Sequence, residues 1–265
     1  MQKMMKVISL GLGVQSTAMY LMSSLDEIER ADYAIFADPG AEDPKTYEIL
    51  DRLKSWAKEN NGIEIIVNDE MNLYEDLLDK DKTKRFAGIP AFVDNPNKKG
   101  MLRRQCTNHY KIRPVIKSIR KIYGLKPKFR MPMTEVWLGI SMDEIQRMKT
   151  STLPRVTYRY PLIDNRLDRK DCVKIFEKYS FPTPPKSACV FCPYRSDRGW
   201  KQIKESDKES WKKIINIDES IRNSLIDRDK GKGGIYLHTS LKHIDDVDFG
   251  DQQELFMCEE GFCGL

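Results

Sequence analysis

The sequence predicts an α/β protein with a parallel sheet, helices on both faces, and a smaller helical C-terminal part that contains cysteines. Short apolar runs alternate with amphipathic helical segments as far as about residue 140, which is the pattern of parallel strands joined by helices. The length of 265 residues suits one large domain with an appendage. We expect an α/β domain over residues 1–165 and a helical region over residues 166–265.

Individual elements follow from apolar periodicity and end signals. Asp43 is a good N-cap and Pro44 fits the first helical position, so a helix should begin there. Residues 70–100 have little periodicity and resemble an insertion. The expected strands cover residues 6–11, 33–37, 63–67 and 135–140, and the expected helices cover 16–22, 44–56, 107–122, 168–179, 197–205 and 208–226.

Composition excludes several classes of protein. Hydrophobic residues make up 40% and charged residues 32%, with a mean hydropathy of −0.57, and no apolar window reaches the length of a membrane span. The first apolar run is interrupted from Gly11 onward, so we expect a first strand rather than a signal peptide, and a cytoplasmic protein without a membrane partner. The net charge of +5 permits an anionic partner without requiring one.

The turn between the first strand and the first helix is a candidate phosphate site. Gly11 and Gly13 allow backbone to approach a phosphate, and the helix that follows offers free N–H groups. Ser16 and Thr17 add hydroxyl donors. The pattern is neither a Walker loop nor a complete GxGxxG, and a tight turn without a ligand is the alternative.

Acidic residues follow the second strand, at the carboxyl edge of the predicted sheet where open α/β folds bind ligands. Asp38 and Glu42 are candidates to hold Mg²⁺ or a ribose, whereas Asp43 is expected only to cap its helix.

Four segments in order resemble the adenine nucleotide α-hydrolase superfamily and its phosphoadenosine phosphosulfate (PAPS) reductase family. Residues 9–16 resemble the pyrophosphate-binding loop, 36–47 the "DTG…E…PET" segment, 139–147 the "G-[VI]-R-x-x-E-S-x-x-R" segment, and 160–164 the "P-L-I-D-W" segment. The family loop usually reads S-G-G-x-D-S, and Leu12 and Gln15 replace a glycine and the aspartate. The resemblance implies a Rossmann-like parallel sheet and an adenine nucleotide bound over the first loop.

The C-terminal part differs from assimilatory reductases of that family. It lacks an E-C-G-[IL]-H segment and the chain has no Cys-Cys pair. The sequence looks closer to PP-loop sulfur-transfer enzymes, such as iron–sulfur tRNA thiolases and DNA phosphorothioation proteins.

The cysteines indicate a metal site. Cys189 and Cys192 form a CxxC, which can place two thiolates on one metal. Cys106 and the C-terminal pair Cys258 and Cys263 offer further ligands, whereas Cys172 fits a helical apolar pattern and should lie in the core. Thiolates select Zn²⁺ or an Fe–S cluster. The resemblance favours [4Fe–4S] on Cys106, Cys189, Cys192 and Cys263, with Cys258 as the other choice for the fourth ligand, and a structural zinc knuckle is the alternative.

Residues 98–130 contain twelve Lys and Arg and no Asp or Glu, which is typical of an anion-binding surface. The interleaved His109, Tyr110 and Phe129 could stack on bases. A solvated helix face is the alternative, and nucleotide phosphates are an equally good target for the cations near Cys106. His238 and His243 show no ligand spacing and are expected at the surface.

Together these features predict an ATP- and Mg²⁺-dependent sulfurtransferase. It would adenylylate an oxygen of a nucleic acid acceptor, tRNA first and DNA second, and take sulfur from a donor protein or sulfide. The alternatives are a thiol-dependent sulfonucleotide reductase and a zinc-stabilised nucleotide- or nucleic-acid-binding protein. The expected catalytic residues are Ser16, Asp38, Cys258 and Cys263. The expected nucleotide-binding residues are Ser9, Gly11, Gly13, Gln15, Ser16, Thr17, Asp38, Glu42, Gly139, Arg103, Arg104, Lys111 and Arg147, with Lys186 and Arg195 as further phosphate candidates.

Overall fold

The computed structural model describes residues 4–79, 88–94, 100–222 and 234–250, and its chain divides into two compact units. Unit 1 comprises Met1–Asp38, Glu42–Met71 and Lys111–Ser187. Unit 2 comprises Pro39–Ala41, Asn72–Tyr110 and Ala188–Leu265. The expected boundary at residue 165 therefore differs from the division in the structure. Residues 166–187 belong to unit 1 because Cys172 and Phe176 pack into its core, whereas Leu73 and Leu77 pack into the core of unit 2.

Unit 1 is built on a five-stranded, entirely parallel sheet with the strand order β3-β2-β1-β6-β7. The four predicted strands are confirmed, and β7 was not predicted because its four residues give only a short alternating run. The strands are β1 (Met5–Ser9), β2 (Tyr33–Ala37), β3 (Ile65–Asn68), β6 (Thr134–Leu138) and β7 (Val156–Arg159).

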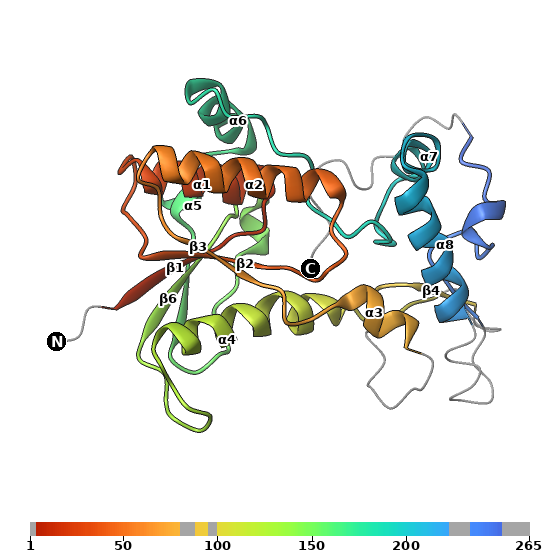
Figure 1. Cartoon of the computed structure of the whole chain (residues 1–265), viewed down its shortest axis with the longest axis horizontal. Helices are drawn as coiled ribbons and strands as arrows, with labels where there is room; N and C mark the ends of the chain where they lie inside the picture. The colour runs from red at the N-terminus through yellow and green to blue at the C-terminus, as the bar shows by residue number, and fades with distance from the viewer. Residues whose placement is uncertain (1–3, 80–87, 95–99, 223–233, 251–265) are drawn as a thin grey trace. The chain divides into compact units, whose positions relative to one another are not determined.

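Helices cover both faces of this sheet, as the α/β prediction requires (Figure 1). Alternate residues of β1 point to opposite faces: Ile8 belongs to the core beneath α1 and α2, whereas Val7 packs with Val115 and Ile119 of α4. The helices on the Ile8 face are α1 (Val14–Ser24), α2 (Pro44–Glu59), α5 (Pro161–Asp164) and α6 (Arg169–Lys178), and α4 (Arg113–Ile122) lies on the other face.

Helix starts in unit 1 follow the sequence signals. The Asp43 carboxylate accepts a hydrogen bond from the Lys45 N–H at 3.1 Å, and Pro44 begins α2 as predicted. Asp168 and Asp171 form a capping box at the start of α6. The predicted helix over 107–122 is correct in position but divided, because a π-helix over Thr107–Ile112 precedes α4.

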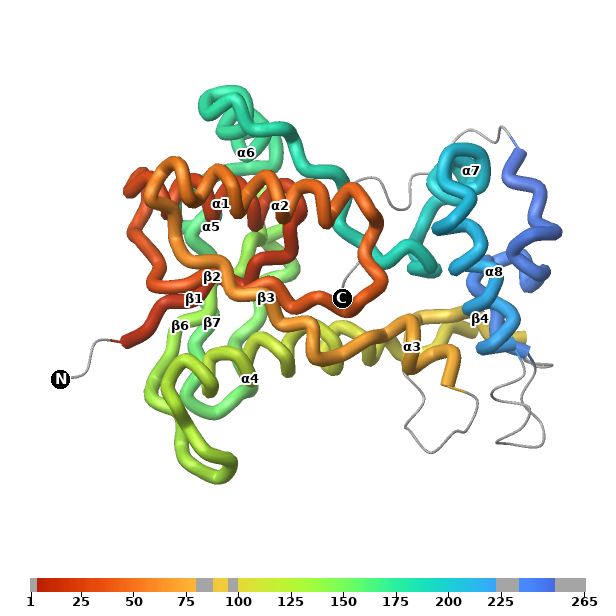
Figure 2. Tube along the Cα trace, in the orientation of Figure 1, coloured from red at the N-terminus to blue at the C-terminus, as the bar shows by residue number. Residues whose placement is uncertain are grey.

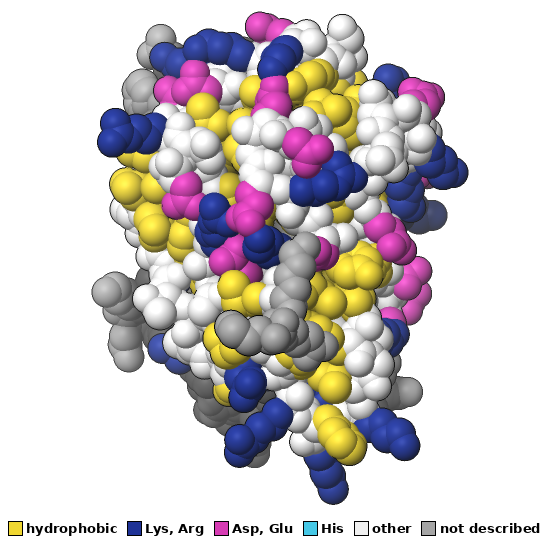
Figure 3. All heavy atoms as spheres, turned by 90° about the vertical axis from the view of Figure 1, so that its left-hand side faces the viewer, with side chains coloured by type: hydrophobic (Ala, Val, Ile, Leu, Met, Phe, Trp, Pro, Cys, Tyr) yellow, Lys and Arg dark blue, Asp and Glu magenta, His cyan; other side chains and the backbone are white. Residues whose placement is uncertain are grey.

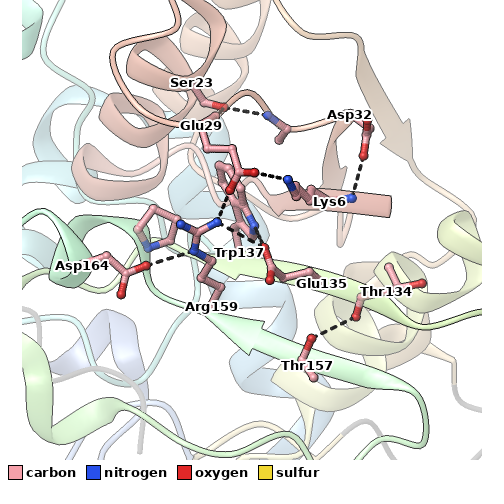
Figure 4. Close-up of polar contacts among 12 residues, drawn as sticks. Lys6, Ser23, Glu29, Asp32, Thr134, Glu135, Trp137, Thr157, Arg159 and Asp164 are labelled. Atoms are coloured by element: carbon pink, nitrogen blue, oxygen red, sulfur yellow. Dashed lines mark hydrogen bonds and ion pairs between the residues drawn. The ribbon is translucent and has the colours of Figure 1, made fainter. Parts of the chain in front are cut away.

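An Arg159-centred polar network ties β6, β7, α5 and the loop after α1 together (Figure 4). The Arg159 guanidinium pairs with Glu29, with Asp164 at 3.0 Å and with Glu135 at 3.5 Å. It also lies over the Trp137 ring, 5.2 Å from the centroid. Hydrogen bonds from Lys6 and Arg159 lower the pKa of Glu29, and the carboxylates raise the pKa of Arg159 against the opposing effect of burial, so the network is charged at neutral pH.

Unit 2 is mainly helical and has its own core. Helices α3 and α8 lie side by side, and the Ser220 hydroxyl donates to the Leu77 carbonyl at 2.8 Å (Figure 2). The low-periodicity segment 70–100 contributes α3 and part of a small antiparallel sheet of order β5-β4-β8. The elements are α3 (Leu73–Leu78), β4 (Phe92–Val93), β5 (Gly100–Met101), α7 (Asp197–Ser206), α8 (Lys208–Arg222) and β8 (Ile235–Tyr236). Within the described ranges no helix has the length and apolar character needed to cross a membrane.

Candidate functional site

The candidate site of unit 1 lies at the carboxyl ends of β1, β2 and β6. The chain builds β2 and β3 on one side of β1 and then returns to add β6 and β7 on the other side. Open parallel sheets bind ligands at such a reversal of strand order, beyond the carboxyl ends of the strands. The β1–α1 loop, residues 10–13, therefore occupies the ligand-binding position of the fold.

The Ser16 hydroxyl braces this loop from inside. It accepts a hydrogen bond from the Gly11 N–H at 3.2 Å and donates to the Gly13 carbonyl at 3.3 Å. The Thr17 N–H donates to the same carbonyl at 3.0 Å and closes the first turn of α1. Ser16 therefore fixes the direction of the loop backbone.

Leu12 has an unusual backbone conformation within this loop. Its φ of 57° lies in the left-handed region, which costs a residue with a side chain about 1–2 kcal/mol. The Leu12 side chain is completely buried in the core beneath α1. Burial of a leucine contributes about 1.5–3 kcal/mol and offsets that cost.

Gly139 is required by a close backbone approach. A Cβ added at Gly139 would lie 2.7 Å from the Ser16 nitrogen and 2.8 Å from the Ser16 Cα. The chain leaving β6 therefore passes directly against the start of α1, and only glycine fits there.

The start of α1 has features of an anion site. Its N-cap is Gly13 and no side chain caps it, so its first N–H groups are available at the positive end of the helix dipole. The Thr17 side chain is completely buried, and within the described residues its Oγ1 atom has no hydrogen-bond partner. Buried hydroxyls without a partner are rare in native proteins, and such a group invites a ligand or a water.

A polar cluster surrounds Gln15. Its amide donates to Glu144 Oε2 at 3.4 Å, and its carbonyl oxygen accepts from Arg169 at 3.2 Å. Glu144 is almost completely buried and pairs with Arg147 at 2.7 Å. Gln15 therefore links Arg169 to Glu144, which in turn pairs with the predicted phosphate residue Arg147. The sequence analysis did not identify Arg169 as a site residue. Arg169 was missed because only folding brings α6 next to the loop.

The two carboxylates predicted for Mg²⁺ or a ribose differ in their surroundings. The Tyr47 hydroxyl donates to Asp38 at 2.8 Å, and burial together with this carboxylate raises the pKa of Tyr47. The Glu42 side chain is completely buried and pairs with Lys111 at 2.7 Å. The Ser187 hydroxyl also donates to Glu42, at 3.2 Å. Glu42 and Lys111 thus engage each other, and Asp38 is the better candidate for a ligand.

In unit 2 the predicted CxxC forms a tight turn. The Cys192 N–H donates to the Cys189 carbonyl at 3.1 Å, and the Arg195 N–H donates to the Cys192 carbonyl at 3.0 Å. Neither cysteine is in a disulfide, and both are half-buried.

Cys106 belongs to the same unit, and its segment contacts the residues that follow this turn. Cys106 and Cys189 both pack against the core of unit 2. Arg104 lies over the Tyr194 ring, 5.7 Å from its centroid, so the segments on which Cys106 and Cys192 lie are neighbours.

Cysteine is the donor type expected for a thiophilic metal. However, no three His, Cys, Asp or Glu side chains among the described residues gather closely enough to hold one metal ion. The predicted ligands Cys258 and Cys263 lie outside the described residues. The described cysteines therefore do not by themselves form a complete metal site.

The basic stretch is divided between the two units. Arg103 and Arg104 belong to unit 2, whereas the cations after residue 110 belong to unit 1. Lys117 and Lys121 on α4 both pair with Glu70. The predicted stacking residue Tyr110 is buried and donates to Asp76 at 2.6 Å, and burial together with this carboxylate raises its pKa.

The expectation that His238 lies at the surface is wrong. The ring is buried, and its Nε2 and Nδ1 atoms lie 3.0 Å from Asp197 and 2.8 Å from the Ser240 hydroxyl. The Ser240 N–H donates to Nδ1 at 3.1 Å, so Nε2 carries the proton and donates to Asp197. Because Ser240 follows His238 by two residues in one turn, these contacts stabilise the turn.

No protein-family model matches the chain, and no curated protein matches it in sequence. The fold defines an α/β protein with a Rossmann-like parallel sheet. Of the predicted nucleotide-binding residues and phosphate candidates, Arg103, Arg104 and Arg195 lie in unit 2, and the others lie in unit 1: Ser9, Gly11, Gly13, Gln15, Ser16, Thr17, Asp38, Glu42, Lys111, Gly139, Arg147 and Lys186.

Proposed function

We propose that unit 1 binds ATP with its phosphates over the β1–α1 loop. The observation that carries this proposal is the position of the loop at the reversal of strand order, where Gly139 packs against the start of α1, which no side chain caps. Backbone N–H groups at such a helix start suit phosphate oxygens. Arg147 and Arg169 would add positive charge beside the phosphates.

The proposed reaction has two steps. An oxygen of a nucleic acid acceptor such as tRNA attacks the α-phosphorus of ATP, the bond to the pyrophosphate oxygen breaks, and pyrophosphate leaves. Hydrosulfide then attacks the acceptor carbon, and the carbon–oxygen bond breaks to release AMP. No electron donor is needed, because sulfur enters and remains at the sulfide level. The part of unit 1 would be to position the phosphates and neutralise their charge.

Asp38 is the proposed ligand of Mg²⁺, since a carboxylate oxygen suits this ion and Glu42 is engaged by Lys111. Mg²⁺, when bound, would neutralise phosphate charge.

We also propose that Cys106, Cys189, Cys192 and either Cys258 or Cys263 bind a [4Fe–4S] cluster, which would supply a binding place for sulfur. The support is the type of donor and the neighbouring segments of Cys106 and Cys192. Metal analysis and the visible spectrum of protein purified without air test this proposal. Iron with broad visible absorption is expected, and colourless protein with bound zinc would contradict the cluster.

The Ser16→Ala variant tests the nucleotide site. It removes two hydrogen bonds that brace the loop, and at about 0.5–1.5 kcal/mol each this predicts roughly 5-fold to 150-fold weaker ATP binding. Calorimetric titration of ATP and pyrophosphate release under anaerobic conditions are the measurements. Ser206→Ala is the matched control, because that exposed hydroxyl bonds only within α7 of unit 2. Wild-type protein that does not bind ATP would refute the proposal.

A sulfonucleotide such as PAPS is the second candidate substrate. The observation that favours it is Gln15, which places an amide and Arg169 where the resembling loops have an acidic residue. This arrangement adds positive charge and removes a possible metal ligand. Sulfite release from PAPS without ATP, in the presence of a thiol reductant, would favour this candidate over ATP-dependent sulfur transfer.

A further inference from the structure

The loop between α4 and β6, residues 123–133, carries an exposed aromatic ring among cations. We name it the Phe129 loop. Phe129 is 62% exposed, the highest value among the large hydrophobic residues that the structure describes. Lys126, Lys128 and Arg130 surround it in sequence and are exposed. A ring this exposed adds little to the core of unit 1, and its face is accessible to a partner.

Two hydrogen bonds from Arg120 on α4 hold the backbone of the loop. The Arg120 guanidinium donates to the Lys126 carbonyl at 2.9 Å and to the Phe129 carbonyl at 3.0 Å. Lys128 has a φ of 75°, in the left-handed region that is unfavourable for a residue with a side chain. Surrounding contacts must maintain such a conformation, and residues of this kind gather at binding sites. The ring is therefore presented on a fixed backbone.

The charge around the ring is uncompensated. In the part of the chain that the structure describes, Lys126, Lys128 and Arg130 form no ion pair, in contrast to Lys117 and Lys121, which share Glu70. The sequence contains no acidic residue from Lys98 until Glu135. Figure 3 shows this side of the molecule, where Lys and Arg side chains gather around a hydrophobic one at the lower end.

We propose that the Phe129 loop binds single-stranded nucleic acid, with a base stacked on Phe129 and neighbouring phosphates held by Lys126, Lys128 and Arg130. Exposed aromatic rings within a basic surface are how proteins hold single strands without reading their sequence. This inference deepens the proposed function, on whose nucleic acid acceptor it rests.

The loop is a docking site and not the place of reaction. It leads directly into the first residue of β6, so it lies at the amino edge of the sheet, whereas the β1–α1 loop lies at the carboxyl edge of the same unit. A strand of five residues separates the two edges by about 16 Å. An acceptor docked here would reach the nucleotide only through another of its segments, which favours a long polymer over a single nucleotide.

An anionic membrane is a less suitable partner. Membrane-binding surfaces insert several apolar side chains or one face of an amphipathic helix. The Phe129 loop offers one ring and the partly exposed Met133.

The test measures fluorescence anisotropy of a short labelled single-stranded RNA, without ATP, at several salt concentrations. Phe129→Ser should weaken RNA binding about 5-fold to 150-fold relative to the wild type, whereas Phe129→Trp should bind as tightly as the wild type. Changing Lys126, Lys128 and Arg130 to Gln together should reduce the salt slope of log K by about 2.

A matched triple variant separates a local site from general charge attraction. The control changes three exposed lysines of α8 to Gln: Lys208, Lys212 and Lys213. It removes three positive charges, as many as the triple variant of the Phe129 loop. This control should leave the salt slope unchanged. Equal effects of the two triple variants, or an unaffected Phe129→Ser, would overturn the proposal. Binding to anionic lipid vesicles but not to RNA would overturn it as well. Calorimetric ATP binding, measured separately, should be unchanged in the Phe129 loop variants, so failure of this proposal is distinguishable from failure of the nucleotide site.

Discussion

Gly139→Ala is the substitution that most sharply probes the contact between β6 and the start of α1. The added Cβ would lie 2.7 Å from one backbone atom of Ser16 and 2.8 Å from another. Carbon atoms in ordinary contact are about 3.5–4.0 Å from their neighbours. The overlap is therefore close to 1 Å against backbone that cannot rotate away, and the expected destabilisation is about 1–3 kcal/mol.

Hydrogen exchange of a peptide covering residues 10–24 measures the destabilisation of α1 directly, because the amides of α1 exchange when the helix opens. The variant should exchange about 5-fold to 150-fold faster in α1 than the wild type and should lose ATP binding.

Gly11→Ala is the matched control in the same loop. The nearest heavy atom to its added Cβ is the Ser16 Oγ at 3.7 Å, which is ordinary contact. We expect normal protection of α1 but weakened ATP binding, since the methyl group occupies the space above the loop. Unchanged protection of α1 in Gly139→Ala would refute the reasoning about the close approach.

Two further predictions concern buried groups. Lys111→Met should destabilise the protein by roughly 2–3 kcal/mol in urea unfolding, because it leaves the buried Glu42 carboxylate without its cation. This loss is smaller than that for a fully buried ion pair, because the Lys111 side chain is partly exposed. Adding Glu42→Gln should recover more than half of this loss, and no recovery would contradict the ion-pair explanation. Burial raises the pKa of the Cys172 thiol to about 12, so at pH 8 iodoacetamide should label Cys189 but not Cys172, as peptide mapping would show. Labelling of Cys172 in native protein at pH 8 would contradict this prediction. Because the pKa of the thiol is higher in the folded than in the unfolded protein, the stability that the buried neutral thiol contributes is complete below about pH 9 and is lost as the pH rises toward 12.

Local sequence signals predicted most of the sheet and helices of unit 1. Asp43 with Pro44, and the capping box that begins at Asp168, mark helix starts through contacts within four residues. The apolar runs of β1 and β2 are strong because both faces of a parallel strand are buried.

The features of the fold and site that were not predicted depend on contacts between residues far apart in the sequence. The Gly139–Ser16 approach, the Glu42–Lys111 pair and the Gln15–Arg169 bond join segments that no local pattern connects. The division into units was missed for the same reason, since each unit is assembled from three separate stretches of chain.

The most direct test of the central claim is an ATP titration followed by backbone amide NMR of the isotope-labelled protein. The account predicts saturable shifts of the Gly11, Gly13, Ser16 and Gly139 amides. Absence of shifts in this loop at saturating ATP, or shifts confined to other parts of the chain, would contradict it.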